Sequence, residues 1–401
     1  MQFNVRRILT ENIKDEIKKI GFSPSYLDFG VLKHKFLNIK VYNLKPEAAT
    51  IIKQTALSSN CDAAIHRGVL DHSEAVSDLI LSGTIAQLQT VSEKLKSQQF
   101  SLDKISDEIL KQIQIFEKEG AQNTDGAFRP KIMGILNITE DSFSDGGLFL
   151  KPFDAIEYCY KMIQDGVNII DIGAESTRPM AKPVDSSVEI GRITPVIKEL
   201  KQDSVFKDIK ISIDTRNADT ARVMWDFGAD IINDVSGLTY DPDMTKTIKE
   251  TGLNVVIMHS RGTPKDMDNL CQYKDTAEEV YFELVKRVQK AVESGVQPDK
   301  IIVDPGFGFA KNSEQNFELV KKIEEFKSLG FPILAGLSRK RFVKSIITDV
   351  SADGAKAHNN KTLDDLTAQL SFYFALKKID IIRVHNVAKT KQALDLAAHL
   401  I

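Results

Sequence analysis

Cysteine and long apolar runs are both scarce in this sequence of 401 residues. Its three cysteines, Cys61, Cys159 and Cys271, lie far apart and form no CxxC pair, so neither a disulfide framework nor a zinc ribbon is expected. No run of ~18 apolar residues occurs, and the charged first residues lack the apolar stretch of a secretory signal. These absences argue against a membrane partner and predict a protein that works in the cytoplasm.

A strong charge of either sign is also missing, because the formal net charge is only −3. Without a global basic field, nucleic acid is not an expected partner. The chain is long enough for two domains. A polar stretch with two glycines and a proline, residues 116–130, separates a charged helical pattern from an apolar strand. We therefore expect a smaller α+β domain over residues 1–123 and a larger domain over residues 124–401.

The first domain has the pattern of a mixed α+β unit, but no motif in it demands chemistry. Residues 36–44 and 61–70 are typical of strands, and residues 46–57 predict a helix that begins at a proline. A long helical pattern then runs from about residue 85 to residue 119. The role of this domain is open between a docking or oligomerisation module and a stabilising extension without chemistry.

The second domain alternates short β-branched runs with amphipathic helical segments. Eight strand candidates can be counted, and they begin at Lys131, Asn168, Ile209, Asp230, Asn254, Lys300, Phe331 and Asp380. Eight strands that each precede a helix predict a (β/α)8 TIM barrel. The rival is a doubly wound sheet, which needs a Gly-x-Gly-x-x-Gly turn after its first strand, and none is present. Trp225, the only tryptophan, lies on a predicted helix and is expected in the core.

Polar residues follow the apolar part of every predicted strand, at the end where a TIM barrel has its active site. They are Asn137, Asp171, Asp214, Asn233 with Asp234, His259 after Met258, Asp304, residues 338–341, and Arg383 with His385. Each of them alone is explained equally well by a helix cap or a turn. Eight such groups at one rim favour a binding site instead.

The residue types at this rim indicate the ligand. Asp214, Asn233 and Asp304 are acceptors that suit a flat heterocycle with several N–H donors. Cations gather after the last two strands, the usual phosphate site of this fold, and they are Arg339, Lys340, Arg341, Arg383 and His385. Asn137 has a side-chain oxygen that can bind Mg²⁺. The pattern predicts a heterocycle with a phosphate or diphosphate and leaves the reaction open.

The reaction is implied by a resemblance to a known family. The sequence resembles the dihydropteroate synthases, in order and spacing, in the stretches GILNITEDSFSDGG, DIGAESTRP, SIDT, IINDVSG, DPGFGF, GLSRKRF and RVHNV. The resemblance implies a folate-pathway transferase that joins 4-aminobenzoate to (7,8-dihydropterin-6-yl)methyl diphosphate, and a sulfonamide target. Two rivals are a pterin-binding methyltransferase that serves a corrinoid, which lacks STRP and SRK, and a catalytically silent binding protein. The second rival predicts that binding residues at the mouth of the barrel have been replaced, whereas all of them are present in this sequence.

The resemblance also implies a role for each matching position. The catalytic residues would be Asp214, Lys340, Arg383 and His385. The pterin would be bound by Asp214, Asn233, Met258, Asp304, Lys340 and Arg383. The diphosphate would be held by Asn137, Arg383 and His385, with Asn137 acting through Mg²⁺. The aminobenzoate pocket would comprise Thr177, Arg178, Pro179, Phe307 and Arg341, and residues 141–147 would form a lid. A homodimer is implied by the resemblance alone.

Three positions depart from the family pattern. Glu140 stands where proline is usual, Met180 where glycine is usual, and Arg341 where serine is common. An arginine at position 341 would strengthen binding of the aminobenzoate carboxylate, alter sulfonamide discrimination or be a tolerated surface change. Residues 1–123 lack the Gly/Asp/Arg-rich ATP-site pattern of the kinase that makes the diphosphate substrate, so a fused kinase is not expected.

Overall fold

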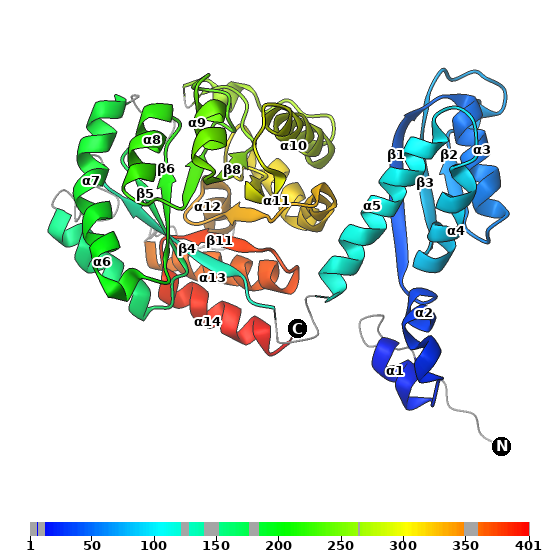
Figure 1. Ribbon diagram of the computed structural model, residues 1–401, viewed down its shortest axis with the longest axis horizontal. Helices are drawn as coiled ribbons and strands as arrows, with labels where there is room; N and C mark the ends of the chain where they lie inside the picture. Colours follow the sequence, from blue (N-terminus) through cyan, green and yellow to red (C-terminus); the bar gives the residue numbers. More distant parts are fainter. Residues whose placement is uncertain are drawn as a thin grey trace. The chain divides into compact units, whose positions relative to one another are not determined.

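The chain divides into two compact units, Met1–Gln122 and Asn123–Ile401 (Figure 1). This computed structural model describes residues 6, 13–121, 128–139, 152–175, 184–263, 265–348 and 360–400, without the side chains of residues 120, 121, 347 and 348. Each unit has a hydrophobic core of its own. The two units are therefore described separately.

The N-terminal unit is a three-stranded antiparallel sheet packed against helices. Its strands β1 (Phe36–Leu44), β2 (Asp62–Ile65) and β3 (Ser77–Thr84) pair in the order β1-β3-β2. Its helices are α1 (Ile13–Lys19), α2 (Leu27–Leu32), α3 (Pro46–Leu57), α4 (Ile85–Leu95) and α5 (Leu102–Ala121). Leu79 and Leu81 of β3 are fully buried because alternate side chains of a strand face the same side, here toward the helices.

Three details of this unit differ from expectation. Strand β3 lies in a stretch for which no strand is predicted. The single helix expected over residues 85–119 is instead two helices, because Phe100 and Ser101 adopt left-handed φ angles of 64° and 57° between α4 and α5. Strand β2 ends at Ile65, since His66 Nδ1 accepts a hydrogen bond from Gly68 N (3.1 Å) and caps a short 3-10 turn.

The second unit is a parallel barrel of eight strands, so the predicted TIM barrel is confirmed. Its strands are β4 (Lys131–Asn137), β5 (Ile169–Gly173), β6 (Lys210–Asp214), β7 (Ile231–Asp234), β8 (Asn254–Met258), β9 (Ile301–Asp304), β10 (Leu334–Gly336) and β11 (Ile381–Val384). They pair in chain order from β4 to β9, and β11 pairs with both β10 and β4. A parallel bridge between Val303 and Ile333 joins β9 to β10 and closes the barrel.

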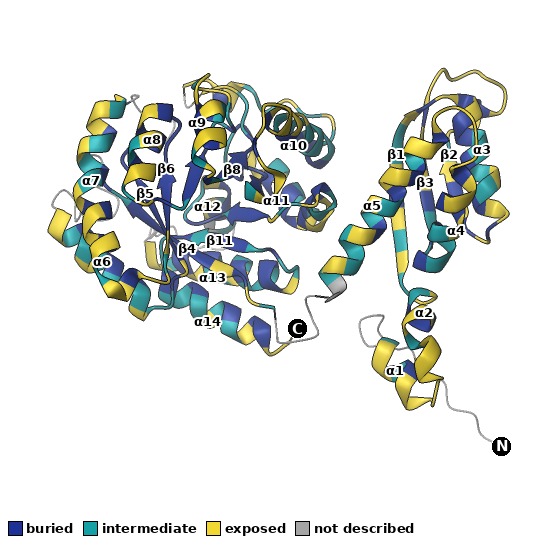
Figure 2. Cartoon of the chain, viewed as in Figure 1, coloured by how far each residue is buried: buried dark blue, intermediate teal, exposed yellow. Residues whose placement is uncertain are grey.

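Helices cover the outside of the barrel (Figure 1). They are α6 (Pro152–Gln164), α7 (Ser186–Gln202), α8 (Ala218–Asp226), α9 (Met244–Thr251), α10 (Thr276–Glu293), α11 (Ser313–Lys321), α12 (Arg341–Thr348), α13 (Asn360–Leu376) and α14 (Val387–Ala398). Figure 2 shows buried strands within and exposed helix faces outside. Trp225 of α8 is 43% exposed, so its expected place in the core is wrong. Within the described ranges, no helix combines the length and apolarity that a membrane span requires.

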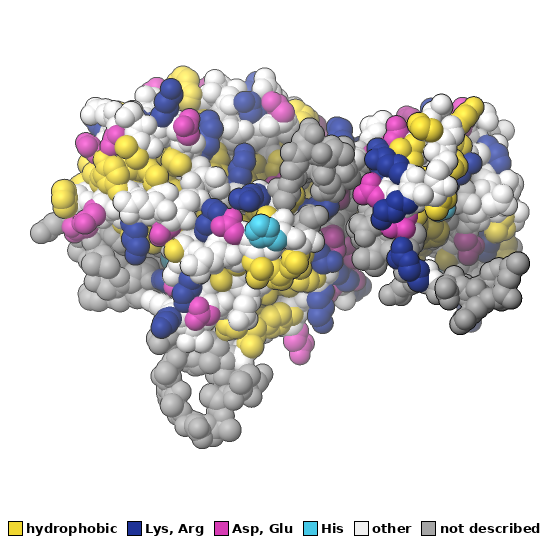
Figure 3. All heavy atoms as spheres, turned by 90° about the horizontal axis from the view of Figure 1, so that it is seen from below, with side chains coloured by type: hydrophobic (Ala, Val, Ile, Leu, Met, Phe, Trp, Pro, Cys, Tyr) yellow, Lys and Arg dark blue, Asp and Glu magenta, His cyan; other side chains and the backbone are white. Residues whose placement is uncertain are grey.

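The apolar strands are short and continuous because both of their faces are buried. One face fills the inside of the barrel with a layer from seven strands, made of Met133, Ile169, Ile231, Val256, Ile302, Leu334 and Ile381. The other face packs against the helices. On the surface seen in Figure 3, acidic and basic side chains are interspersed, in keeping with the net charge of −3. Since side chains fill the interior, a ligand must bind at the mouth.

Candidate functional site

Four adjacent strands bring residues at or next to their carboxyl ends into one row at the mouth of the barrel. The backbone register pairs Asn137 with Gly173, Gly173 with Asp214, and Asp214 with Asn233. A Cβ added to Gly173 would lie 3.4 Å from Asp214 Cβ and 3.6 Å from Asn137 Oδ1. Because Gly173 has no side chain, nothing separates the side chains of Asn137 and Asp214 on either side of it. These two side chains therefore belong to one site.

Arg383 of β11 joins this row through a buried ion network. Its Nε donates to Asp171 Oδ2 (2.6 Å), and its Nη2 donates to Asp214 Oδ2 (2.7 Å). Asn233 Nδ2 donates to the same Asp171 oxygen at 3.0 Å. Asp171 is fully buried, and within the described part of the chain its other oxygen has no hydrogen-bond partner. Asp171 therefore fixes the directions of the Arg383 and Asn233 side chains.

Strand β9 and the two loops beside it add an acid, an amine and a ring. Asp304 ends β9 and pairs in register with Met258, which ends β8. Asp304 Oδ1 accepts a hydrogen bond from Gly306 N at 2.7 Å. Lys340, in the loop after β10, has its Nζ 4.0 Å from the centroid of the Phe309 ring. The charges of Asp304 and Lys340 are thus close enough to interact with each other and with Arg383.

Burial moves the pKa values of these groups toward neutrality. Burial raises the pKa of Asp214 to about 7, although the charge of Arg383 opposes the shift. Burial raises the pKa of Asp304 to about 6 against the opposing Gly306 N–H group and Lys340 charge. Burial and the charge of Arg383 lower the pKa of Lys340 to about 8. Clustered shifts of this kind are typical of binding and catalytic sites.

The cations predicted after β10 and β11 do not all belong to this group. His385 Nδ1 lies 2.9 Å from Ser338 Oγ, at the end of β11. Arg339 instead pairs with Asp364 of α13, with Nε 2.8 Å from Oδ1 and Nη2 3.2 Å from Oδ2. A buried carboxylate thus already pairs with Arg339, and its expected part in binding phosphate stays a prediction.

Arg341 begins α12 and is paired with Asp268, which lies between β8 and α10. Its Nη2 is 2.5 Å from Asp268 Oδ1 and its Nη1 is 3.1 Å from Oδ2. The side chains are 63% and 51% exposed, respectively, so this pair is solvated, in contrast to the pair of Arg383 with Asp171. An exposed pair is weak and easily separated.

Of the other residues predicted for the aminobenzoate pocket, Phe307 is the one within the described part of the chain. Phe307 is 1% exposed and packs in the core beside Phe342 and Phe374. The ring that contacts Lys340 is Phe309, which the sequence does not single out. Outside the described residues lie Thr177, Arg178 and Pro179, the variant positions Glu140 and Met180, and the predicted lid 141–147.

The sequence interpretation places Asp171 at the rim but assigns it no partner. It does not single out Phe309 or Asp268, which contact Lys340 and Arg341. A signal existed for Asp171, since an acid inside an apolar strand needs a buried partner. The GFGF stretch offers two equivalent phenylalanines, and no rule chooses between them. Asp268 lies in a polar segment, and its partner Arg341 is far away in the sequence.

Comparisons with known proteins identify the family. A model of the pterin binding enzyme family matches residues 133–385. The chain is 41% identical over 268 residues to the dihydropteroate synthase of Mycobacterium leprae, which covers 66% of this chain and 91% of that protein. The chain belongs to the dihydropteroate synthase family. This confirms the predicted family and its transferase activity, in which 4-aminobenzoate is joined to the pterin diphosphate.

Two further dihydropteroate synthases extend the likeness. The Yersinia pestis enzyme, in a crystal structure with a sulfonamide drug, shares 33% sequence identity with this chain. The two structures match with a TM-score of 0.63 over 68% of this chain and 94% of that one. The probable bifunctional folylpolyglutamate synthase/dihydropteroate synthase of Halobacterium salinarum is 36% identical over 353 residues, which are 87% of this chain and 41% of that protein. Because residues 123–401 number fewer than 353, this match reaches into the N-terminal unit.

Proposed function

We propose that this dihydropteroate synthase binds its pterin at the mouth of the barrel, between β6 and β9. The observation that carries the proposal is the network in which Asp171 orients Arg383 and Asn233 in the row that holds Asp214. Fixed buried acceptors recognise the N–H groups of a heterocycle sharply. The full set proposed for the pterin is Asp214, Asn233, Met258, Asp304, Lys340 and Arg383.

The diphosphate is proposed to lie beside Asn137, Arg383 and His385. Among the described residues, no cluster of three or more His, Cys, Asp or Glu side chains could hold a metal by itself. Asn137 offers one amide oxygen at the end of β4. This fits Mg²⁺, which is usually held by one or two protein oxygens together with substrate phosphates. When bound, the ion would neutralise part of the charge on the diphosphate.

The chemistry requires binding and charge stabilisation rather than a nucleophilic side chain. The nitrogen of 4-aminobenzoate forms a bond to the pterin methylene carbon while the bond from that carbon to the diphosphate oxygen breaks. The diphosphate leaves with the bonding electrons, and the nitrogen loses a proton. Arg383 and His385 would stabilise the negative charge on the departing group. The Asp214 carboxylate would favour positive charge that spreads into the pterin ring.

The pH dependence of kcat/KM for the pterin diphosphate is expected to be bell-shaped. Asp304 and Asp214 accept hydrogen bonds from ring N–H groups more strongly when ionised, so activity should rise as the pH passes their pKa values of about 6 and about 7. Lys340 needs its proton, so activity should fall as the pH passes about 8. Initial rates from about pH 5 to about pH 9 measure the profile. A flat profile over this range would contradict these roles.

Arg341 is proposed to bind the aminobenzoate carboxylate in competition with Asp268. The exposed ion pair contributes at most about 1 kcal/mol, so Asp268→Asn should lower the KM for 4-aminobenzoate by about threefold. Arg341→Ser should raise it by about tenfold, because a charge-assisted contact is lost. Steady-state kinetics at saturating pterin diphosphate measure both effects, with the exposed Asp299→Asn as a control. An unchanged KM in Asp268→Asn would rule out the competition.

The test of the proposed function is diphosphate release by the purified full chain. The protein receives the pterin diphosphate, Mg²⁺ and 4-aminobenzoate, and each component is omitted in turn. Release should require the arylamine, and a sulfonamide should compete with it. Tight pterin binding without any release would favour a methyltransferase or a silent binding protein instead.

The N-terminal unit is proposed to be a docking or oligomerisation module, and the full protein a homodimer. Support comes from the separate core of this unit and from the match of its sequence to the Halobacterium salinarum protein. The molar mass of the full chain in solution, measured by light scattering, tests the dimer. A monomer at micromolar concentration would leave the stabilising extension as the better explanation.

A further inference from the structure

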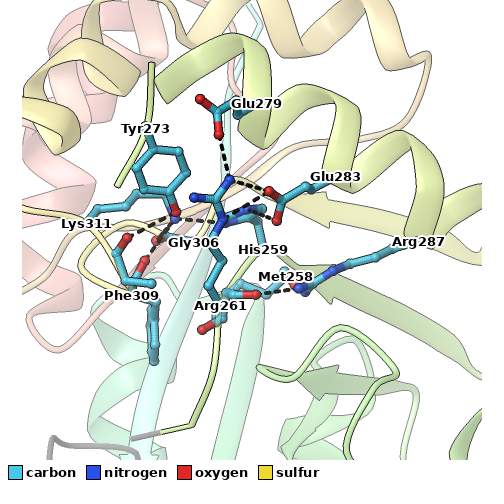
Figure 4. Close-up of polar contacts among 12 residues, drawn as sticks. Met258, His259, Arg261, Tyr273, Glu279, Glu283, Arg287, Gly306, Phe309 and Lys311 are labelled. Carbon is cyan, nitrogen blue, oxygen red and sulfur yellow. Dashed lines mark hydrogen bonds and ion pairs between the residues drawn. The ribbon is translucent and has the colours of Figure 1, made fainter. Parts of the chain in front are cut away.

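Lys311 is a buried lysine close to the pterin site for which the reaction above has no use. It is 6% exposed and lies in the loop after Asp304. Its Nζ lies 2.9 Å from Gly306 O, 3.0 Å from Phe309 O and 2.9 Å from His259 Nδ1 (Figure 4). A lysine ammonium has three N–H donors and no acceptor. Lys311 therefore has one acceptor for each donor, which indicates the charged form.

This arrangement fixes the proton of His259. Its Nδ1 accepts from Lys311, so Nε2 carries the proton and donates to Glu283 Oε2 at 3.0 Å. Burial lowers the pKa of His259 to about 3, which keeps the ring neutral. Glu283 also accepts from Arg261, whose Nε is 3.0 Å from Oε1. The side chains of Lys311, His259, Glu283 and Arg261 form one continuous chain of hydrogen bonds (Figure 4).

The chain of hydrogen bonds holds the loop that follows Asp304. Gly306 has a φ of +71°, and a Cβ there would lie 1.8 Å from His259 O, so this loop packs directly on the end of β8. Phe309 O is bound by Lys311, and the Phe309 ring lies under Lys340. The backbone N–H of Gly306 in turn binds the Asp304 carboxylate. Lys311 thus binds the carbonyl groups of Gly306 and Phe309, at the two ends of one loop segment. At one end of this segment Gly306 binds Asp304, and at the other end Phe309 contacts Lys340.

We infer that Lys311 is a positioning residue for the pterin, one that orients Asp304 and the Phe309–Lys340 pair and places a positive charge behind the Asp304 carboxylate. The inference rests on the proposed pterin site. Charged groups that face Lys311 are Asp304, Glu283, Arg287 and Arg261, with neutral His259 in contact. Burial lowers the pKa of Lys311, whereas the charge of Asp304 and the three acceptors around Nζ favour its charged form. Because a pterin N–H would be bound by ionised Asp304, the charge of Lys311 supports the binding form.

The test is Lys311→Met, which keeps an unbranched side chain of nearly the same length but removes its charge and its donors. The KM for the pterin diphosphate should rise by about tenfold, while the KM for 4-aminobenzoate stays within about twofold. The acid limb of kcat/KM should move to higher pH by up to about one unit, because Asp304 loses a nearby cation. Lys290→Met, on the exposed side of α10, is the matched control and should behave as the unmodified enzyme.

The outcomes separate this inference from the proposed function. If the unmodified enzyme and Lys290→Met lack synthase activity, the function itself fails. If both are active and Lys311→Met melts earlier but keeps the KM and the acid limb, Lys311 is only structural and the inference is overturned. If Lys311→Met does not fold, Lys311→Arg decides, since it retains the charge and donors. If the acid limb of the kcat/KM profile of Lys311→Arg matches that of the unmodified enzyme, the inference is supported. If this limb is shifted, the inference is overturned.

Discussion

Replacing Arg383 by methionine is expected to lower kcat/KM for the pterin diphosphate by roughly a thousandfold. The substitution removes the cation that would stabilise the departing diphosphate. It also leaves Asp171 and Asp214, both bound to Arg383 at 2.6 and 2.7 Å, as buried acids without their counter-ion. Diphosphate release under steady-state conditions measures the loss.

A matched control for this change is Arg222→Met on α8. Arg222 is 47% exposed and pairs with an exposed glutamate, so its loss should cost less than about 1 kcal/mol in stability and leave the rate unchanged. Circular dichroism of Arg383→Met establishes that the barrel is folded. A folded Arg383→Met variant with more than a tenth of the normal kcat/KM would show that the ion network has no part in the reaction.

The second large effect is expected for Asp214→Asn. Asparagine has nearly the same shape, but it replaces one acceptor oxygen by a donor and removes the charge that faces Arg383. Loss of charged hydrogen bonds to the ring should raise the KM for the pterin diphosphate by about a hundredfold. The KM for 4-aminobenzoate should change far less, and the acid limb near pH 7 should disappear from the pH profile.

The control for this variant is Asp219→Asn, at an exposed position on α8. Pterin affinity is measured directly by isothermal titration, so that binding is separated from chemistry. Equal affinity in Asp214→Asn and Asp219→Asn would exclude Asp214 as the pterin acceptor, whatever the rate.

The barrel could be predicted from the sequence because its signal is local. Strand β4 coincides with the predicted run Lys131–Asn137, since an apolar stretch buried on both faces has clear ends. Strand β3 was not predicted because its burial alternates while its sequence does not, since the apolar Ile80 is exposed between buried Leu79 and Leu81. Trp225 is exposed although tryptophan is usually buried, because burial is decided by the helix face and not by the residue type alone.

The site was predictable only in part, because its contacts join distant strands. That Asp214 and Asn233 share a site follows from their places at the ends of neighbouring strands. Which acid binds Arg383 does not follow, since Asp171 lies 212 residues away and the pairing depends on closure of the barrel. Arg339 and Arg341 look alike in the sequence, yet one meets Asp364 and the other Asp268.

The two kinds of ion pair have different consequences under selection by inhibitors. The Arg341–Asp268 pair is exposed and isolated, so either residue can change at little cost to the fold. The oxygen of Asp171 that binds Arg383 also binds Asn233, so a substitution there disturbs two contacts at once. If the proposed sites are correct, a drug that imitates aminobenzoate would bind where the enzyme can vary. A drug that imitates the pterin would leave the enzyme few single-step routes of escape that preserve activity.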